Sequence, residues 1–396
     1  MSFLDSLAAA FKGARPADRP PLARSYASPW LFPEAYGLSS PRGTFNYDAA
    51  IRAGYLHNPV AQRAVRLVAE GVGGAPLSAS DPALGALVAA TSAGQSLAET
   101  IAAQLLLHGN GYIQVLKDAH GRPVELFALR PERVTVVPDA SGWPAAFDYR
   151  VGEAALRIEA LDDLGRPNLI HLKGYHPADD HYGAGCLDAA GEAVAIHNAA
   201  AAWNRALLEN GARPSGALVY DTGEPGAVLA PDQFDRLKAE LASAYAGAVN
   251  AGRPMLLEGG LKWQSLSLSP ADMDFATLKA AAARDIALAF GVPPMQLGLP
   301  GDATYANYRE ANRALWRLTL LPLTGKILSA ITEGLAPWFP AATLNVDLDR
   351  VPALAEDRER LWAQVTAADF LSPGEKRALL GLPEPEKAEP ETRNDA

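Results

Sequence analysis

The feature that most restricts the fold is a block of short β-forming runs, residues 112–172, between two regions of helical pattern. Turn residues such as Asp118–Gly121 and Asp139–Gly142 separate the runs, a spacing typical of an antiparallel meander. The six runs cover residues 112–117, 124–129, 133–137, 146–151, 155–159 and 169–172. The sequence therefore predicts a mixed α+β fold.

Helical patterns flank this block. Asn58 and Pro59 predict the start of a helix over 59–70, and Ser96 with Glu99 predicts a capping box for a helix over 97–108. After the block, the sequence predicts Ala-rich helices over 187–209 and 270–290, strands at 215–220, 254–257, 261–266 and 343–348, and helices over 231–246, 354–365 and 373–380. A long helical pattern over 305–335 contains Pro322, where we expect a kink.

The composition excludes several classes of protein. Of 396 residues, 49% are hydrophobic and 20% charged, so the chain can bury a sizeable core. The net charge of −10 argues against tight nucleic-acid binding, which depends on neutralising phosphates. No apolar run reaches the ~18 residues that span a bilayer, and the start lacks a secretory signal, so we expect no membrane association and a cytoplasmic origin. Cys186 is the single cysteine, which excludes an internal disulfide.

Motif searches leave few candidates for catalysis. Phosphate-binding glycine loops, HExxH, GxSxG and the EF-hand pattern are all absent. One loop, HPADDHYGAGC (176–186), carries His176, Asp179, Asp180 and His181, with Cys186 as a softer ligand type. A metal-dependent hydrolase built on this cluster is one hypothesis, and a polar loop with a buried cysteine is the simpler interpretation, which we favour.

Two further patterns leave alternatives open. Arg309, Arg313 and Arg317 share one helix face with interleaved aromatic residues, which suits either a nucleic-acid surface or, as we favour, a stripe paired with acidic neighbours. Residues 2–12 form an amphipathic pattern that suits a membrane-surface scaffold, although Asp5 and Lys12 are its only charges.

Eight segments, in order, resemble the portal proteins of long-tailed double-stranded DNA phages, the family that also serves alphaproteobacterial gene transfer agents. They include NPVAQRAVRLVAEGVGGAPL (58–77), RDIALAFGVPPMQLGL (284–299) and LSPGEKRALLGLPE (371–384). The others are 105–137, 168–194, 210–221, 252–275 and 303–323. The resemblance covers roughly residues 45–385. The Ala-rich composition of the chain is more like that of a gene-transfer-agent protein than that of a large-phage protein.

The resemblance implies the phage portal fold with a series of regions. They are an N-terminal arm (1–44), a wing of helices and antiparallel strands (45–185), a first stem helix (186–211), an α/β clip (212–268), a second stem helix (269–291), a tunnel loop (292–304), a kinked wing helix and strand (305–350), a small helical crown (351–382) and a disordered tail (383–396). Because the crown is small, contacts that larger crowns make inside the head are not expected here.

The resemblance also implies a function without a catalytic site or cofactor. It implies a ring of twelve subunits at one capsid vertex of a phage or gene-transfer-agent particle, assembled in the bacterial cytoplasm. Double-stranded DNA passes through its channel during packaging and ejection and binds to it only weakly. The implied partners are the major capsid protein, the large terminase subunit, which supplies the ATPase, and a head–tail adaptor.

The resemblance assigns three sets of residues. The tunnel loop carries Gln296, Leu297, Gly298, Leu299, Pro300, Gly301 and Asp302, with Asp302 its only charge. The clip docks its partners through Arg236, Lys238 and Glu240, and Pro322 kinks the long helix. The two Ala-rich helices have side chains that look too small to bury well within one monomer, so we expect them to pack between subunits.

Overall fold

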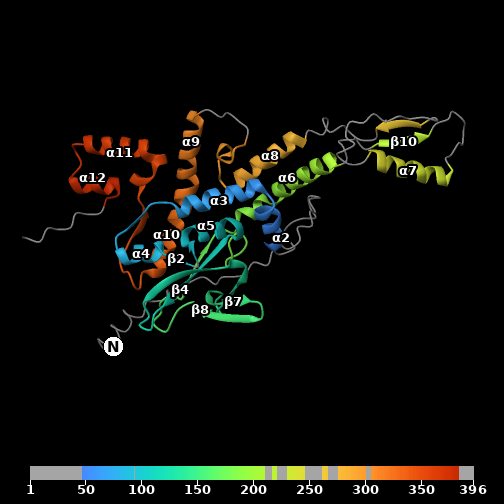
Figure 1. Ribbon diagram of the computed structural model, residues 1–396. Coiled ribbons are helices and arrows are strands. Elements are labelled where there is room, and N and C mark those ends of the chain that lie inside the picture. The colour runs from blue at the N-terminus through green and yellow to red at the C-terminus, as the bar shows by residue number, and fades with distance from the viewer. Residues whose placement is uncertain are drawn as a thin grey trace, which may run out of the picture.

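A computed structural model describes residues 47–92, 94–209, 216–220, 230–245, 261–265, 275–299 and 305–382. The predicted arm, the tail and the strand at 254–257 lie outside these residues. The described part combines helices with antiparallel strands (Figure 1), as the sequence predicted.

Three helices form the centre of the main hydrophobic core: α3 (Pro59–Gly73), α5 (Leu97–His108) and α10 (Leu321–Leu335). The Asn58 carboxamide oxygen accepts hydrogen bonds from the backbone N–H groups of Val60 and Ala61, at 3.1 and 3.0 Å, which fixes the start of α3. α5 begins after Ser96, and Gly109, with φ of 80°, ends it. Both helices therefore start where predicted, although only half of the expected capping box is present: the Ser96 hydroxyl accepts from the Glu99 N–H at 3.5 Å. Short α4 (Pro82–Ala89), α2 (Tyr47–Ile51) and a π turn, η2 (Arg52–Leu56), pack around them.

The strands of residues 110–173 form two sheets rather than one meander. β5 (Pro123–Leu129), β4 (Asn110–Lys117) and β9 (Leu169–Lys173) make one sheet in that order. β6 (Val134–Pro138), β7 (Pro144–Val151) and β8 (Ala154–Glu159) make the other. The 3₁₀ turn η3 (Pro131–Arg133) separates the sheets, and β9 returns to pair with β4. The positions of the six strands were predicted to within two residues, whereas the single meander was wrong.

A second, smaller core lies between the two sheets and takes side chains from both. Tyr112 and Phe147 are its largest buried side chains, and the Tyr112 ring stacks on His171, with ring centroids 4.3 Å apart. Burial, reinforced by the charge of Lys173, lowers the pKa of His171 to about 3. His171 is therefore held neutral between the two sheets.

The long helix is irregular one turn before its proline. It consists of α9 (Tyr305–Leu315), a π turn η6 (Trp316–Leu320) and α10. The Leu321 N–H donates to the carbonyl of Trp316, five residues earlier. Pro322 has no N–H to donate the next hydrogen bond of the helix. The widened turn therefore lies directly before the proline, at the place where we expect the kink.

This helix corrects the expectation about apolar runs. By length and composition, Ala306–Leu335 is apolar enough to cross a membrane, although 33% of its most apolar window is buried inside the protein. Ile327, Leu328 and Ile331 are almost completely buried in the main core. The apolar character of the helix is therefore at least partly that of a core helix.

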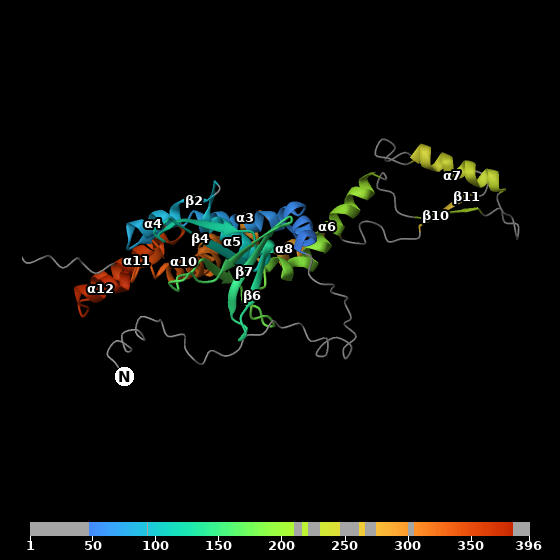
Figure 2. The ribbon, with the colours of Figure 1, turned by 90° about the horizontal axis from the view of Figure 1, so that it is seen from below.

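The C-terminal helices lie at one end of the molecule (Figures 1 and 2). α11 (Ala355–Ala367) and α12 (Pro373–Leu380) pack on each other, and Ser372 and Glu375 form a complete capping box. The strand predicted at 343–348 is β12 (Leu344–Val346), which pairs with β1 (Leu77–Ala79). Asp349 anchors α11 by accepting hydrogen bonds from Arg358 at 2.6 Å and from the Trp362 indole at 3.1 Å.

Candidate channel and docking surfaces

The two Ala-rich helices lie side by side in both views, reaching away from the sheets (Figure 2). They are α6 (Cys186–Glu209) and α8 (Phe275–Ala289). Near their far ends, the Trp203 and Phe275 rings stack with centroids 5.5 Å apart. The buried alanines are Ala190, Ala200, Ala282, Ala283 and Ala287. The expectation that these faces are too small to bury within one chain is therefore wrong in part, because the small side chains let the two helices approach closely.

The outer faces of the α6–α8 pair remain open in the single chain. Leu288 is 78% exposed, Trp203 46% and Leu278 44%, and Ile196 is also exposed. Exposed apolar side chains of this size along two paired helices are typical of a surface that another protein covers.

The entry to α6 is joined to the end of α5 by backbone contacts among glycines. The Gly174 N–H donates to the carbonyl of Gly109 at 2.7 Å, and the Gly183 N–H donates to the buried Asn110 side chain at 2.8 Å. A Cβ atom on Gly109 would lie 2.5 Å from the Gly183 carbonyl oxygen and the Gly185 nitrogen. Only glycine fits at this crossing, which we call the glycine junction (Gly109, Gly174, Gly183 and Gly185).

The described half of the predicted tunnel loop is folded. Val292 is buried, Pro294–Leu297 form a 3₁₀ turn (η5), and Leu297 packs against the main core. Gln296 is in the same turn, with its side-chain Nε2 buried and without a hydrogen-bond partner among the described residues. Gly298 follows in the left-handed conformation (φ 71°), and Leu299 is half-buried. Pro300, Gly301 and Asp302 lie outside the described residues, so the loop role assigned to this segment stays a prediction.

The predicted clip is described in three pieces. β10 (Gly216–Tyr220) pairs antiparallel with β11 (Leu261–Ser265), and α7 (Pro231–Tyr245) lies near them, beyond the ends of α6 and α8 (Figure 1). Arg236 and Lys238 are exposed on α7, and Glu240 belongs to the same helix. Two of the three residues assigned to docking thus lie on an accessible surface, and their partners stay predictions.

The loop that carries the candidate metal ligands uses its side chains to hold the backbone. Asp179 accepts hydrogen bonds from the N–H groups of His181 and Tyr182, at 2.7 and 3.0 Å, and the buried His181 ring lies 2.7 Å from the carbonyl of Gly142. His176 accepts from the Ala178 N–H, and Asp180 is exposed. Burial raises the pKa of the Cys186 thiol. Across the described ranges, no three His, Cys, Asp or Glu side chains are grouped as metal ligands.

The arginines of the long helix have acidic neighbours. Arg313 lies 2.7 Å from Glu356 and 3.1 Å from Glu310, and Arg309 lies 3.0 Å from Glu356. Arg317 is exposed. Two of the three arginines therefore join the long helix to α11, as the favoured interpretation had it, which leaves little free positive charge for nucleic acid.

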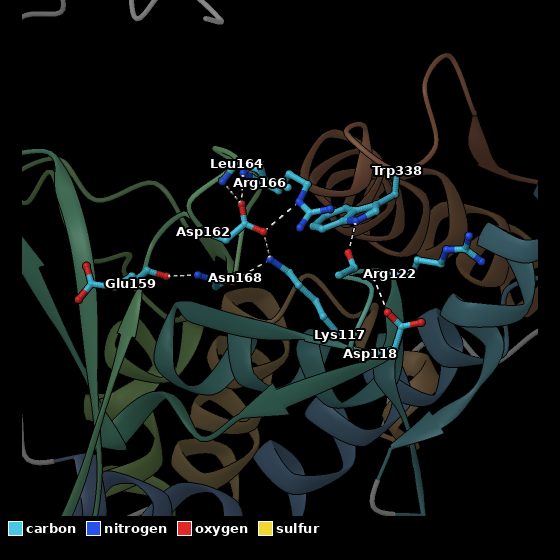
Figure 3. Close-up of polar contacts among 10 residues, drawn as sticks. Lys117, Asp118, Arg122, Glu159, Asp162, Leu164, Arg166, Asn168 and Trp338 are labelled. Carbon is cyan, nitrogen blue, oxygen red and sulfur yellow. Dashed lines mark hydrogen bonds and ion pairs between the residues drawn. The ribbon is translucent and has the colours of Figure 1, made fainter. Parts of the chain in front are cut away.

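A polar cluster that the sequence did not reveal joins the first sheet to the end of α10 (Figure 3). The Lys117 ammonium lies 2.9 Å from Asp162 and 2.7 Å from Asn168, and Asp162 also accepts from Arg166 at 2.9 Å. Lys117 and Arg166 both lie over the Trp338 ring, 5.0 and 5.3 Å from its centroid. The Trp338 indole N–H donates to the Gly121 carbonyl at 2.7 Å.

A repeated turn could have identified part of this cluster. Asp118, Asp139 and Asp162 each begin an Asp-x-x-Gly turn, and each carboxylate accepts hydrogen bonds from the N–H groups two and four residues later. The three closing glycines all have positive φ. The first two turns were expected between strands, and the third has the same spacing.

Comparison with known proteins accounts for this arrangement. The family model described as phage portal protein matches residues 59–381. A chain in the virion of a native gene transfer agent particle is 49% identical, with a TM-score of 0.66, covering 86% of this chain and 94% of that one. A chain in the neck of the native particle, computed with C12 symmetry, matches with the same values. An uncharacterised protein of Rickettsia bellii is 40% identical over 344 residues, 83% of this chain and 88% of its own length.

The match to the family model runs from the first residue of α3 to the residue after α12, so it includes both sheets, the α6–α8 pair and the C-terminal helices. The similarity to the gene-transfer-agent chains extends over the same architecture. At 49% identity, the two chains share more than a fold. The chain is a portal protein and belongs to the phage portal protein family.

Proposed function

We propose that twelve copies of this chain form a closed ring at one vertex of a capsid and that double-stranded DNA enters and leaves through its channel. One observation carries the proposal: the chain is 49% identical to a protein in a gene-transfer-agent neck computed with C12 symmetry. Near-complete coverage of that protein, at 94%, means that the elements available to build its ring have counterparts here.

The open faces of the α6–α8 pair support a ring. Exposed Ile196, Trp203, Leu278 and Leu288 would be covered by the same pair in neighbouring copies. Head-to-tail contacts that close after a full rotation give a ring rather than a fibre. The α6–α8 pair then serves as the stem, and small residues on its faces allow close packing between copies as well as within one.

The charge supports a channel that does not hold DNA tightly. Twelve copies with a net charge of −10 each carry −120 in total. Net repulsion avoids the release of counterions that makes nucleic-acid binding tight. Residues 300–302 follow the folded turn η5 and supply the segment that guides the duplex by steric contact, because Asp302 is their only charge.

The remaining regions dock partners. The exposed cations Arg236 and Lys238 on α7 suit an acidic surface on the large terminase subunit during filling and on the head–tail adaptor afterwards. The wing (45–185) faces the major capsid protein. The portal itself is structural, since the energy for packaging comes from the terminase, and it acts within the particle after assembly in the bacterial cytoplasm.

Imaging of the purified protein and of particles tests the ring. We expect a twelve-fold ring of about 500 kDa, which is twelve times the 41.8 kDa chain, at a single vertex. Particles in which the chain occurs only as a 42 kDa monomer, or rings with no counterpart at any vertex, would contradict the proposal.

Two sets of variants test the assigned regions. Because Leu297 packs against the core, the loop test replaces only residues 300–302 with two glycines, and we expect intact rings with less packaged or retained DNA. Arg236→Glu with Lys238→Glu should block filling or tail joining while rings still form. Arg360→Glu, which reverses an exposed charge on α11 outside the surfaces assigned to partners, is the matched control. Normal DNA content in the loop variant would refute the role assigned to the loop, and normal filling with normal tail joining in the Arg236/Lys238 variant would refute the role assigned to the clip. Neither result would refute the ring.

A further inference from the structure

A half-open groove lies between α3, α5 and the second sheet and belongs to none of the surfaces described above. It has a volume of about 870 Å³. Its walls carry four aromatic rings from four different elements, those of Tyr47, Tyr55, Phe127 and Tyr149, and each ring is only partly buried. Tyr47 is held in place by an edge-to-face contact with His108, with ring centroids 4.8 Å apart. The groove thus offers aromatic surface from four elements, and the Tyr47 ring is fixed in position by this contact.

The charged residues at the groove include pairs that satisfy one another. Arg66 lies 2.6 Å from Glu70, and Glu132 lies 3.8 and 4.0 Å from Arg130 and Arg133. In contrast, the Gln104 side chain is only half satisfied. Its Nε2 donates to the Leu129 carbonyl at 2.9 Å, while its buried Oε1 has no hydrogen-bond partner in the described part of the chain. A ligand that fits the groove would bring apolar or aromatic surface to meet these rings.

The sequence before the groove has this chemistry. Residues 1–46 lie outside the described part, and the described chain begins at Tyr47, which itself lines the groove. Residues 29–33 read Pro-Trp-Leu-Phe-Pro. Proline-rich segments bind grooves lined by aromatic rings, because their extended conformation costs little entropy to fix. Trp30 and Phe32 supply the aromatic surface that such a groove takes.

We propose that residues 29–33 bind this groove within the same chain, with Trp30 and Phe32 against its aromatic walls. From Leu31 to Tyr47 the chain has 16 steps, enough to reach about 50 Å when extended, so folding back is sterically easy. A tether this short holds the segment at about millimolar effective concentration. Binding within one chain is therefore favoured over binding to a separate copy in solution. The proposal concerns a surface separate from the channel and does not depend on the ring.

Disulfide trapping in the full-length chain tests the inference. In a Cys186→Ser background, Leu31→Cys is combined with Ala103→Cys, which lies on α5 in the groove wall. The matched control combines Leu31→Cys with Ala83→Cys, an exposed position on α4 that does not line the groove. Linkage is read after mild oxidation by non-reducing electrophoresis and peptide mapping.

We expect most chains of the Ala103 pair to form an intrachain disulfide and few chains of the Ala83 pair to do so. Adding Trp30→Ala with Phe32→Ala should reduce the Ala103 yield to that of the control, whereas Phe3→Ala with Leu4→Ala should leave it unchanged. Equal yields for the Ala103 and Ala83 pairs would overturn the proposal. A disulfide that forms between copies would also overturn it, because the groove would then take the arm of a neighbouring subunit.

Discussion

The Lys117 ammonium lies 2.9 Å from the Asp162 carboxylate, so a salt bridge joins the end of β4 to the turn before β9. Both side chains are mostly buried, at 13% and 19% exposed. Burial alone would raise the pKa of Asp162. Hydrogen bonds from Lys117 and from the backbone and guanidinium of Arg166 outweigh it and hold that pKa well below its usual range.

Asp162→Asn should therefore destabilise the chain at neutral pH by about 2 kcal/mol, since it leaves Lys117 and Arg166 without their shared anion. The lowered pKa means that the native state binds fewer protons than the unfolded state. The contribution of Asp162 is thus full above about pH 4 and is lost as the pH falls below that value. Urea unfolding at pH 7 and pH 3 measures both effects.

We expect the difference between Asp162→Asn and the parent to shrink at pH 3. The matched control is Asp163→Asn, which changes the neighbouring exposed carboxylate and should alter the free energy of unfolding by less than about 0.5 kcal/mol. Equal losses for the two variants would show that the Lys117 cluster does not stabilise the fold.

His171 predicts a second pH dependence, in a higher range. Its pKa is lowered to about 3 in the folded chain, mainly by burial, and is about 6.5 when unfolded. The unfolded state therefore binds more protons between these values, and stability falls as the pH drops from about 6.5 toward about 3, by up to about 1.4 kcal/mol per pH unit. His171→Gln should make unfolding less dependent on pH across this range. His120→Gln, in an exposed turn, should leave the dependence as it is in the parent.

The glycine junction predicts a contrast between two glycines of similar backbone conformation. Gly109 and Gly94 have φ of 80° and 79°, but an added Cβ meets backbone atoms at Gly109 and open space at Gly94. Gly94→Ala should cost about 1 kcal/mol, from its positive φ alone. Gly109→Ala adds a backbone clash and should cost at least about 3 kcal/mol or prevent folding. The melting temperatures of the two variants test this contrast. Equal melting temperatures would contradict the close backbone approach at the glycine junction.

Pro322 predicts a local change in the long helix. Pro322→Ala supplies the missing N–H group, so we expect a new amide protected from hydrogen exchange at position 322 and a gain of about 1 kcal/mol in unfolding free energy. Pro373→Ala is the control, because Pro373 occupies the first turn of α12, where an N–H has no helical acceptor. Rapid exchange of the new amide in the Pro322→Ala variant would mean that η6 does not arise from the proline.

Local signals in the sequence predicted most elements. Asn58 and Ser96 cap helices that start where their side chains predict, because a cap is satisfied within three residues. The strands of residues 110–173 could be predicted because runs of β-forming residues and the turn residues between them determine structure over a few neighbouring positions. The pairing of β9 with β4, and of β1 with β12, depends on contacts between distant segments and could not be read from spacing.

The site was less predictable for the same reason. The salt bridge between Lys117 and Asp162 joins residues 45 positions apart, and nothing near Lys117 in the sequence indicates its partner. Leu297 looked like part of an open loop, yet it packs against the main core, and its turn η5 contacts α3, α8 and α9. Small side chains on α6 suggested weak burial, whereas their size is what lets α8 approach.

The glycine junction also has a mechanical consequence. Because α5, the end of β9 and the entry to α6 touch there through backbone atoms, no side-chain rotation at the contact can absorb a displacement. A push or twist applied along α6 is therefore passed to α5 and the first sheet through backbone contacts. In the ring that we propose, strain on the α6–α8 pair would therefore travel to the sheets of each copy.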